Sequence, residues 1–191
     1  MSTTTVTSNE TTLKNLMTAF QGESNASAKY AAFAKKADQE GFGRVASLFR
    51  AASRAEQIHA GNHAKVIEKL GAKVEAKLDP VHVGTTAENL KVAIAGEEYE
   101  RDVMYPDFIQ EAEAQKNTAA VRTFQWALEA EAEHARLYNY ALKHLNEQRT
   151  RTVFYVCFAC GYTTDDQDLM RCAVCNAPQR EVRTNRVGMS K

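Results

Sequence analysis

The sequence lacks the features that would direct a chain to a nucleic acid, a membrane or the secretory route. Its 191 residues carry 24 basic and 24 acidic side chains, so no charge excess attracts nucleic acid or an anionic membrane surface. No apolar run approaches the roughly 18 residues of a membrane-spanning helix. Residues 1–10, rich in Thr and Ser, show neither the basic nor the apolar region of a secretory signal. We therefore expect a cytoplasmic protein whose first ten residues are flexible.

Cysteine is also scarce, and no cysteine is left unpaired by the sequence pattern. The four cysteines form two Cys-x-x-Cys pairs, Cys157 with Cys160 and Cys172 with Cys175, separated by eleven residues. In a chain without an export signal, this arrangement indicates a tetrathiolate metal site rather than disulfides. A segment of about 35 residues is too small to fold on its apolar core alone, so a metal would stabilise it. The same four sulfurs suit either a zinc ribbon or a mononuclear iron site.

Apolar residues that recur at alternating steps of three and four predict four long helices. The seams cover residues 13–37, 45–70, 90–104 and 120–145. We therefore expect a mainly α protein with a four-helix bundle over residues 1–148.

Breaks between the seams indicate how these helices connect. Gly71 is a plausible C′ residue of the second helix, and Thr86 is a suitable N-cap for the third. Pro106 should kink or interrupt the third helix. Residues 72–85 include Pro80 and have no helical period. Such a connection is long for antiparallel neighbours, and it favours a crossover that makes the third helix parallel to the second, as in ferritin-like bundles.

Glu or His interrupts all four apolar seams near the middle. A Glu facing a bundle core is costly unless it is paired or bound to a metal, and five carboxylates at similar depth repel one another. Two iron ions would neutralise this charge, and Glu-x-x-His on two helices is the ligand motif of di-iron bundles. The seven candidate ligands are Glu23, Glu56, His59, Glu97, Glu100, Glu131 and His134.

The alternative interpretation of each element is structural. One Glu-x-x-His on a helix is common and usually binds nothing, so the prediction depends on four interrupted seams in register. His63 lies one turn beyond His59, and we expect it to support the ligands or simply to fill the core. We expect Tyr30 and Tyr138 to be packing residues, each with a hydrogen bond.

These motifs together resemble the rubrerythrin family over residues 13–182. The resemblance rests on 22–26 (GESNA), Glu56-x-x-His59, 96–100 (GEEYE) with 104–106 (MYP), and Glu131-x-x-His134. Residues 155–162 (YVCFACGY) resemble the first knuckle of rubredoxin. The second knuckle carries Ala173 where rubredoxin-like domains commonly have Pro, and Asn176 where they have Gly. Asn tolerates a left-handed backbone, so this turn is expected to form.

The resemblance implies a ferritin-like bundle with a rubredoxin-like domain over residues 149–191. It implies two Fe in the carboxylate site, one Fe (or Zn as isolated) at the cysteines, and reduction of hydrogen peroxide with electrons from an external donor. By the same resemblance Glu56 and Glu131 would bridge the irons, Glu23 and Glu97 would be terminal ligands, and His134 would hold one iron. Glu100 and His59 would exchange on the other iron with its oxidation state.

Helix length suggests an oligomer. The fourth helix is expected to run about 13 residues beyond His134 to Glu147, roughly 20 Å, so that the cysteine domain begins far from its own di-iron site. We therefore expect at least a homodimer with head-to-tail electron transfer. Three other functions stay open: a ferroxidase or iron-storage protein, a zinc-ribbon binding module on a structural bundle, and a substrate oxygenase.

Overall fold

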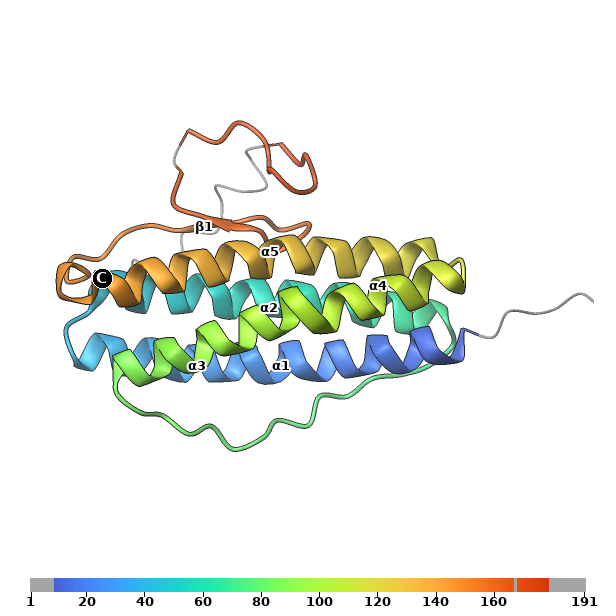
Figure 1. The fold of residues 1–191 in the computed structure, drawn as a ribbon, viewed down its shortest axis with the longest axis horizontal. Coiled ribbons are helices and arrows are strands. Elements are labelled where there is room, and N and C mark those ends of the chain that lie inside the picture. The colour runs from blue at the N-terminus through green and yellow to red at the C-terminus, as the bar shows by residue number, and fades with distance from the viewer. Residues whose placement is uncertain (1–8, 167, 179–191) are drawn as a thin grey trace, which may run out of the picture.

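The computed structural model describes residues 9–166 and 168–178, and it consists of a helical bundle with a small domain on one side (Figure 1). Helices α1 (Glu10–Gln39) and α2 (Gly43–Lys69) form an antiparallel pair. Gly41, with a φ of 76°, makes the turn between them. Within the described ranges, no helix combines the length and the apolar character needed to cross a membrane.

The connection between α2 and α3 (Thr86–Tyr99) is the crossover that the sequence predicted. It contains no helix and runs along the bundle, so α3 runs in the same direction as α2 (Figure 1). Gln21 and Asn25 of α1 hold it through paired hydrogen bonds with the backbone of Lys77 and with Asp79, at 2.6–3.1 Å. The ferritin-like arrangement is therefore confirmed. The N-cap of α3 is Thr85 rather than Thr86, because Thr85 and Glu88 form a reciprocal capping box.

The third helix of the bundle changes its winding in the middle. A π-helical turn, η1 (Glu100–Met104), separates α3 from α4 (Tyr105–Ala114). The Tyr105 amide donates to the Glu100 carbonyl, five residues back. The sequence predicted that Pro106 kinks or interrupts this helix, and the regular winding does change directly before it. Pro106 itself lies in the first turn of α4, where its missing N–H is tolerated. The irregular segment therefore begins at a predicted ligand, which is where π-turns often occur.

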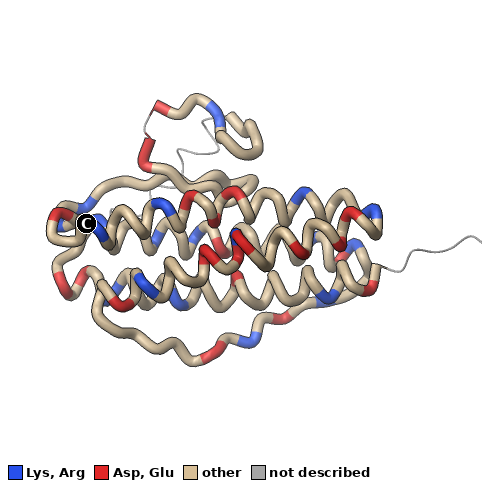
Figure 2. Tube along the Cα trace, in the orientation of Figure 1, with Lys and Arg blue, Asp and Glu red and all other residues tan. Residues whose placement is uncertain are grey.

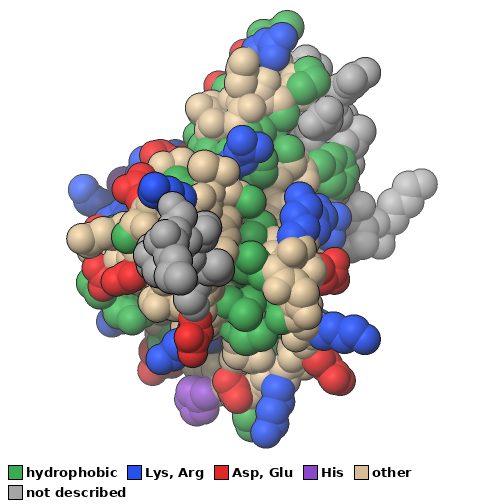
Figure 3. Space-filling model, turned by 90° about the vertical axis from the view of Figure 1, so that its right-hand side faces the viewer, with side chains coloured by type: hydrophobic (Ala, Val, Ile, Leu, Met, Phe, Trp, Pro, Cys, Tyr) green, Lys and Arg blue, Asp and Glu red, His purple; other side chains and the backbone are tan. Residues whose placement is uncertain are grey.

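The bundle is completed by α5 (Thr118–Lys143), and its apolar core is divided by a polar layer. One cluster contains Phe33, Phe49 and Leu90, and the other contains Leu16 and Phe124. The interrupted seam positions lie between them. Acidic positions accordingly occur along the middle of the helices (Figure 2). On the outside, basic and acidic side chains are interspersed around one end of the bundle, as the balanced composition predicts (Figure 3).

The chain reverses after α5 and returns along the bundle. A short 3-10 turn, η2 (Leu145–Glu147), precedes a segment whose carbonyls accept hydrogen bonds at the start of α2: Gly43 N–H donates to Arg149 O and Arg44 N–H to Gln148 O. Strands β1 (Tyr155–Val156) and β2 (Thr163–Thr164) then pair antiparallel, with Val156 opposite Thr163. The backbone of Arg171 also forms an isolated antiparallel bridge with Pro178.

The small domain packs on α2 and α5 of its own chain, which corrects one expectation. Trp126 of α5, the only tryptophan of the sequence, packs against the core of this domain, and Arg44 of α2 pairs with Asp165 at 2.5 Å. The domain was expected to lie far from its own di-iron site, because the fourth helix carries the chain away from His134 as far as Glu147. The chain instead turns back after α5 and brings the domain to the site. That reason for a head-to-tail dimer is lost, and the homodimer stays a prediction. Residues 1–8 of the segment predicted to be flexible and residues 179–191 of the predicted cysteine domain lie outside the described residues.

Candidate metal centres

The structure brings six of the seven predicted bundle ligands into two groups. In each group the potential ligand atoms lie within 4.8 Å of one another, and all six side chains are at most 1% exposed. The two groups share Glu56 and Glu131. The seventh residue, Glu100, belongs to neither group and lies half-buried on η1. The first group is Glu23, Glu56, His59 and Glu131, and the second is Glu56, Glu97, Glu131 and His134.

Helix geometry places the shared carboxylates between the two imidazoles. In each Glu-x-x-His, the His Nδ1 lies 2.8 Å from an oxygen of the Glu three residues earlier. His59 Nδ1 is also 3.0 Å from Glu131 Oε1, and His134 Nδ1 is 3.4 Å from Glu56 Oε1. The ring centroids are 6.4 Å apart. The arrangement is thus nearly symmetric, with Glu56 and Glu131 between the two imidazoles and common to both groups.

Unsatisfied carboxylate oxygens show that this cluster fits metal ions. Each His Nδ1 carries at most one hydrogen and lies nearest to the Glu three residues earlier. One buried oxygen of each of four carboxylates is therefore left without a hydrogen-bond partner among the described residues: Glu23 Oε2, Glu56 Oε1, Glu97 Oε2 and Glu131 Oε1. Buried polar atoms are almost always hydrogen-bonded, because an unpaired one costs about 1–3 kcal/mol. Four such atoms in one cluster are best explained as ligand atoms. Carboxylates and imidazoles are also the donor set that iron binds in four-helix bundles.

The pKa values of these groups point to the same conclusion. Burial, followed by the charge of Glu131, raises the pKa of Glu97 to about 8. Burial, together with Glu56 and Glu131, raises that of Glu23 well above its usual range. Burial would lower the pKa of His59, but Glu131 and Glu56 raise it to about 10. Without a metal, this cluster therefore retains protons at neutral pH, and cations would take their place.

Buried hydroxyl groups support the outer carboxylates. Tyr30 donates to Glu97 Oε1 at 2.6 Å, and Tyr105 donates to Glu23. Tyr30 thus has the hydrogen bond that the sequence predicted for it. His63, fully buried, lies 3.2 Å from Tyr105 Oη and 3.1 Å from Thr123 Oγ1. Burial and the neighbouring His59 lower the pKa of His63 to about 3, so its ring is neutral. His63 thus supports the site without joining either ligand group.

The small domain contacts the outer side of both imidazoles. His59 Nε2 lies 3.0 Å from the Cys160 carbonyl oxygen, and His134 Nε2 lies 3.0 Å from Thr163 Oγ1. This approach requires glycine at position 161, because a Cβ there would collide with His59 Nε2, and its φ is 83°. From the sequence, Gly161 and Tyr105 stand out only as members of the knuckle and MYP motifs, and Thr163 does not stand out at all. Only the nearby Cys-x-x-Cys-Gly motif could have directed attention to this contact.

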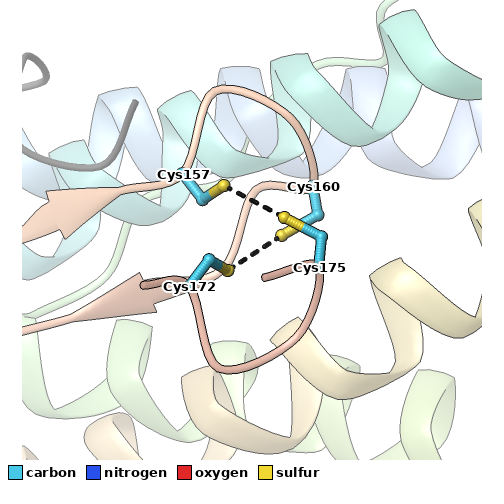
Figure 4. A group of neighbouring side chains, drawn as sticks. All are labelled: Cys157, Cys160, Cys172 and Cys175. Carbon is cyan, nitrogen blue, oxygen red and sulfur yellow. Dashed lines mark hydrogen bonds between the residues drawn. The ribbon is translucent and has the colours of Figure 1, made fainter. Parts of the chain in front are cut away.

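The four cysteines form the second centre, in which each Cys-x-x-Cys pair lies on one turn. Cys157 Sγ and Cys175 Sγ are 3.5 Å apart, as are Cys160 Sγ and Cys172 Sγ (Figure 4). A tetrahedral site with metal–sulfur bonds of about 2.3 Å has sulfurs about 3.8 Å apart, so the four free thiols fit one ion.

The two turns of this centre have equivalent backbones. The amide of Gly161 donates to Cys157 O and that of Asn176 to Cys172 O, at 2.9 and 3.0 Å. The φ of Asn176 is 59°, so Asn takes the left-handed position that Gly161 occupies in the first turn. Cys175 is half-buried, whereas the other three cysteines are buried.

The bundle, its crossover and its paired Glu-x-x-His helices define a ferritin-like di-iron carboxylate protein. The Rubrerythrin family model matches residues 14–142. Rubrerythrin-2 of Clostridium acetobutylicum is 34% identical over 170 residues, covering 87% of this chain and 92% of that protein. Nigerythrin of Nitratidesulfovibrio vulgaris is 35% identical over 169 residues, covering 88% and 83%. The chain therefore belongs to the rubrerythrin family.

Solved structures agree with this assignment. A structure of nigerythrin in a mixed-valence state superposes with a TM-score of 0.84 at 35% identity, covering 90% of this chain and 84% of that one. Bacterioferritin of Mycobacterium tuberculosis, with a TM-score of 0.67 and 20% identity over 73% of this chain and 89% of that one, shares the fold. Rubrerythrins carry a di-iron carboxylate–histidine site, and this chain has a Glu/His cluster for it and a four-cysteine cluster for a rubredoxin-like site.

Proposed function

We propose that this redox di-iron protein is a peroxidase that reduces hydrogen peroxide to water. One observation carries the proposal: a carbonyl oxygen of the cysteine domain accepts a hydrogen bond from a candidate iron ligand, Cys160 O from His59 at 3.0 Å. An Fe(S-Cys)4 centre carries one electron at a time, and a ferroxidase or storage bundle needs no such donor. The direct contact would give such a donor a short path to the bundle site.

In this proposal, the chain's own residues hold and insulate the bundle site. Glu56 and Glu131 would bridge, Glu23 and Glu97 would be terminal ligands, and both His Nδ1 atoms would ligate. The two irons would supply the two electrons of H2O2 + 2 H+ + 2 e− → 2 H2O. Tyr30 keeps its proton and donates it in a hydrogen bond to Glu97 Oε1, which fixes that carboxylate. Apolar clusters on both sides of the polar layer exclude bulk water.

The position of Glu100 fits an exchange of ligands at the first group. The structure places His59, rather than Glu100, with Glu23, Glu56 and Glu131. Partial burial, followed by the charge of Glu97, raises the pKa of Glu100 well above its usual range, which favours the protonated carboxyl over a lone buried charge. The proposal assigns Glu100 as the ligand that would replace His59 when the iron is oxidised. An external electron donor would refill the cysteine centre, whose half-buried Cys175 lies nearest to solvent.

Anaerobic stopped-flow spectroscopy tests the proposed activity. The fully reduced protein is mixed with hydrogen peroxide or with dioxygen, and the visible band of the oxidised Fe(S-Cys)4 centre is followed. Rapid return of the band with peroxide and slow return with dioxygen would support the proposal. A preference for dioxygen would favour a ferroxidase or an oxygenase. A protein with no band in either oxidation state would hold zinc at the cysteines and would fit the binding-module alternative.

Gly161→Ala, studied in the same experiment, tests whether electrons pass from the cysteine centre to the bundle site through the contact between Cys160 and His59. The added methyl group should displace the knuckle from His59, and we expect a roughly 100-fold slower return of the band, since misplacement by about 1 Å can cost that much. Gly22→Ala is a matched control, because a Cβ at Gly22 would meet no heavy atom within 4 Å. Equal rates for the two variants would show that electrons do not pass through this contact.

A further inference from the structure

One segment of the cysteine domain, residues 160–163, reaches both imidazoles of the bundle site. Its first residue offers a backbone carbonyl to His59, and its last offers the Thr163 side chain to His134, each at 3.0 Å. His59, His134 and Thr163 are all at most 1% exposed. The segment therefore spans the 6.4 Å between the ring centroids, and it makes one hydrogen bond to each ring.

The direction of each hydrogen bond follows from the chemistry of the partners. The Cys160 carbonyl can only accept, so His59 Nε2 carries the hydrogen. The Thr163 hydroxyl has a second partner, the Gly161 carbonyl at 3.3 Å, to which it must donate. Its oxygen is then the acceptor for His134 Nε2–H. With a metal bound the two rings would be neutral, and the hydrogen held at Nε2 would leave Nδ1 unprotonated toward the carboxylates, which is the tautomer that a metal ligand needs.

We infer that Thr163 is a positioning residue for His134. Its hydroxyl fixes the tautomer and the ring orientation of His134, and it couples docking of the cysteine domain to metal binding at the second group of ligands. This inference rests on the proposed assignment of His134 as an iron ligand. The partner of a metal-bound imidazole usually changes metal affinity by 10- to 100-fold when it is removed.

The two imidazoles differ in what supports them. The hydrogen bond of His59 is made by backbone, which no side-chain substitution removes directly. The hydrogen bond of His134 depends on one hydroxyl group. Removing that hydroxyl should therefore weaken one metal position and spare the other. A role in packing alone would instead affect both positions together, through loosening of the whole domain.

The neighbouring residue of the same strand provides a matched control. Thr164 is also buried, but its Oγ1 accepts from the Asp166 amide at 3.1 Å and, among the described residues, makes no hydrogen bond to a candidate ligand. Thr163→Val and Thr164→Val each replace one buried hydroxyl group of β2 by a methyl group of similar volume. Thr163→Ser keeps the hydroxyl and should restore the wild-type behaviour.

The test is a titration of the full-length protein with Co²⁺, carried out with zinc already bound at the four cysteines. Visible absorption and calorimetry count the ions that enter the bundle. We expect two ions in the wild type, and a 10- to 100-fold weaker affinity for one of them in Thr163→Val. Thr163→Ser and Thr164→Val should bind both ions as the wild type does.

Two results would overturn the inference. One is wild-type affinity at both positions in Thr163→Val, and the other is an equal loss at both positions. Fluorescence of Trp126, which packs against the cysteine domain, shows whether the domain is still docked. Because the titration uses no peroxide, its outcome is separate from the proposed activity. A selective loss of one ion would support the role of Thr163 even in a protein that reduced no peroxide.

Discussion

The two metal centres of this chain are built in opposite ways. The bundle site takes ligands from four long helices, and its residues extend from Glu23 to His134 along the sequence. The cysteine site takes all its ligands from two turns between Cys157 and Cys175. Two large apolar clusters flank the first site, whereas the second has a small cluster of which three members are cysteines themselves. The bundle can therefore fold around an empty site, and the cysteine domain depends on its ion.

This difference also separates what a metal does in each place. In the bundle, a metal relieves the repulsion between carboxylates that packing has forced together. In the cysteine domain, a metal supplies the cross-link that makes a small fold stable. Replacing one ligand should therefore destabilise the cysteine domain, whereas replacing one ligand of the bundle site should stabilise the metal-free bundle.

The largest expected effect is loss of the cysteine domain in Cys172→Ser. Structural zinc sites bind with about 10–16 kcal/mol, which exceeds what a domain of this size gains from its own core. We expect the domain to unfold and the bundle to keep its helices. Far-UV circular dichroism should hardly change, while fluorescence of Trp126 should shift toward that of an exposed indole.

Glu97→Gln is the matched substitution in the bundle. It removes a buried carboxylate whose oxygen Oε2 lacks a hydrogen-bond partner among the described residues. The metal-free bundle should become slightly more stable, because Glu97 must take up a proton to be buried at neutral pH and Gln need not. Metal binding should weaken, because a carboxylate of the cluster is lost. If Glu97→Gln unfolded the metal-free bundle, or if Cys172→Ser left the Trp126 signal unchanged, the contrast between the two centres would be wrong.

A further prediction concerns the pH dependence of the stability of the metal-free bundle. The folded-state pKa of Glu97 is raised from 4.5 to about 8, and that of His59 from 6.5 to about 10. Between the ordinary and the raised values, the folded state binds more protons than the unfolded state. Stability is therefore highest at low pH within this window, and it falls as pH rises through about 8 and then 10.

Thermal unfolding from pH 6 to pH 9 measures this effect. The Tm of the metal-free protein should fall by about 2–4 °C for each kcal/mol lost. The iron-loaded protein should change less, because the metal replaces the protons and its affinity increases with pH. A metal-free Tm that rose with pH over this range would mean that the carboxylates are ionised in the folded state.

Helical periodicity explains why most of the bundle could be predicted from sequence. A side chain that repeats every three or four residues must lie on one helix face, so Glu56, His59 and Glu131 could be placed in the core without any structure. The long segment without periodicity before Thr85 likewise indicated the crossover. Each of these conclusions depends on residues that are close together in the sequence.

The position of the cysteine domain depends on contacts that no local pattern encodes. Arg149 stacks on Phe42, with 4.2 Å from its guanidinium carbon to the ring centroid, and Arg151 pairs with Asp38 at 3.0 Å. These residues are more than 100 positions apart, and their pairing turns the chain back along the bundle. Thr163 escaped prediction for the same reason, because a lone Thr in a short strand carries no periodic signal.

The smallest expected effects come from two buried tyrosines beside the bundle site. Tyr30 donates to Glu97 at 2.6 Å, whereas the hydroxyl of Tyr138 has no hydrogen-bond partner among the described residues. Their rings contact each other edge to face, with centroids 5.6 Å apart. From the sequence, a hydrogen bond is expected for both tyrosines, and among the described residues only Tyr30 of this pair makes one. The pair therefore separates the contribution of the hydrogen bond from that of ring packing.

Tyr30→Phe and Tyr138→Phe each remove one oxygen and keep the ring. In the metal-loaded protein, Tyr30→Phe should lower the free energy of unfolding by about 1.5–3 kcal/mol, the usual contribution of a hydrogen bond to a charged group. Tyr138→Phe should leave it unchanged or raise it by up to about 1 kcal/mol, because a buried hydroxyl without a partner is removed. Denaturant unfolding of both variants measures the difference. Equal losses would mean that Tyr138 also donates to the site, so that hydroxyl groups would support it from two sides rather than one.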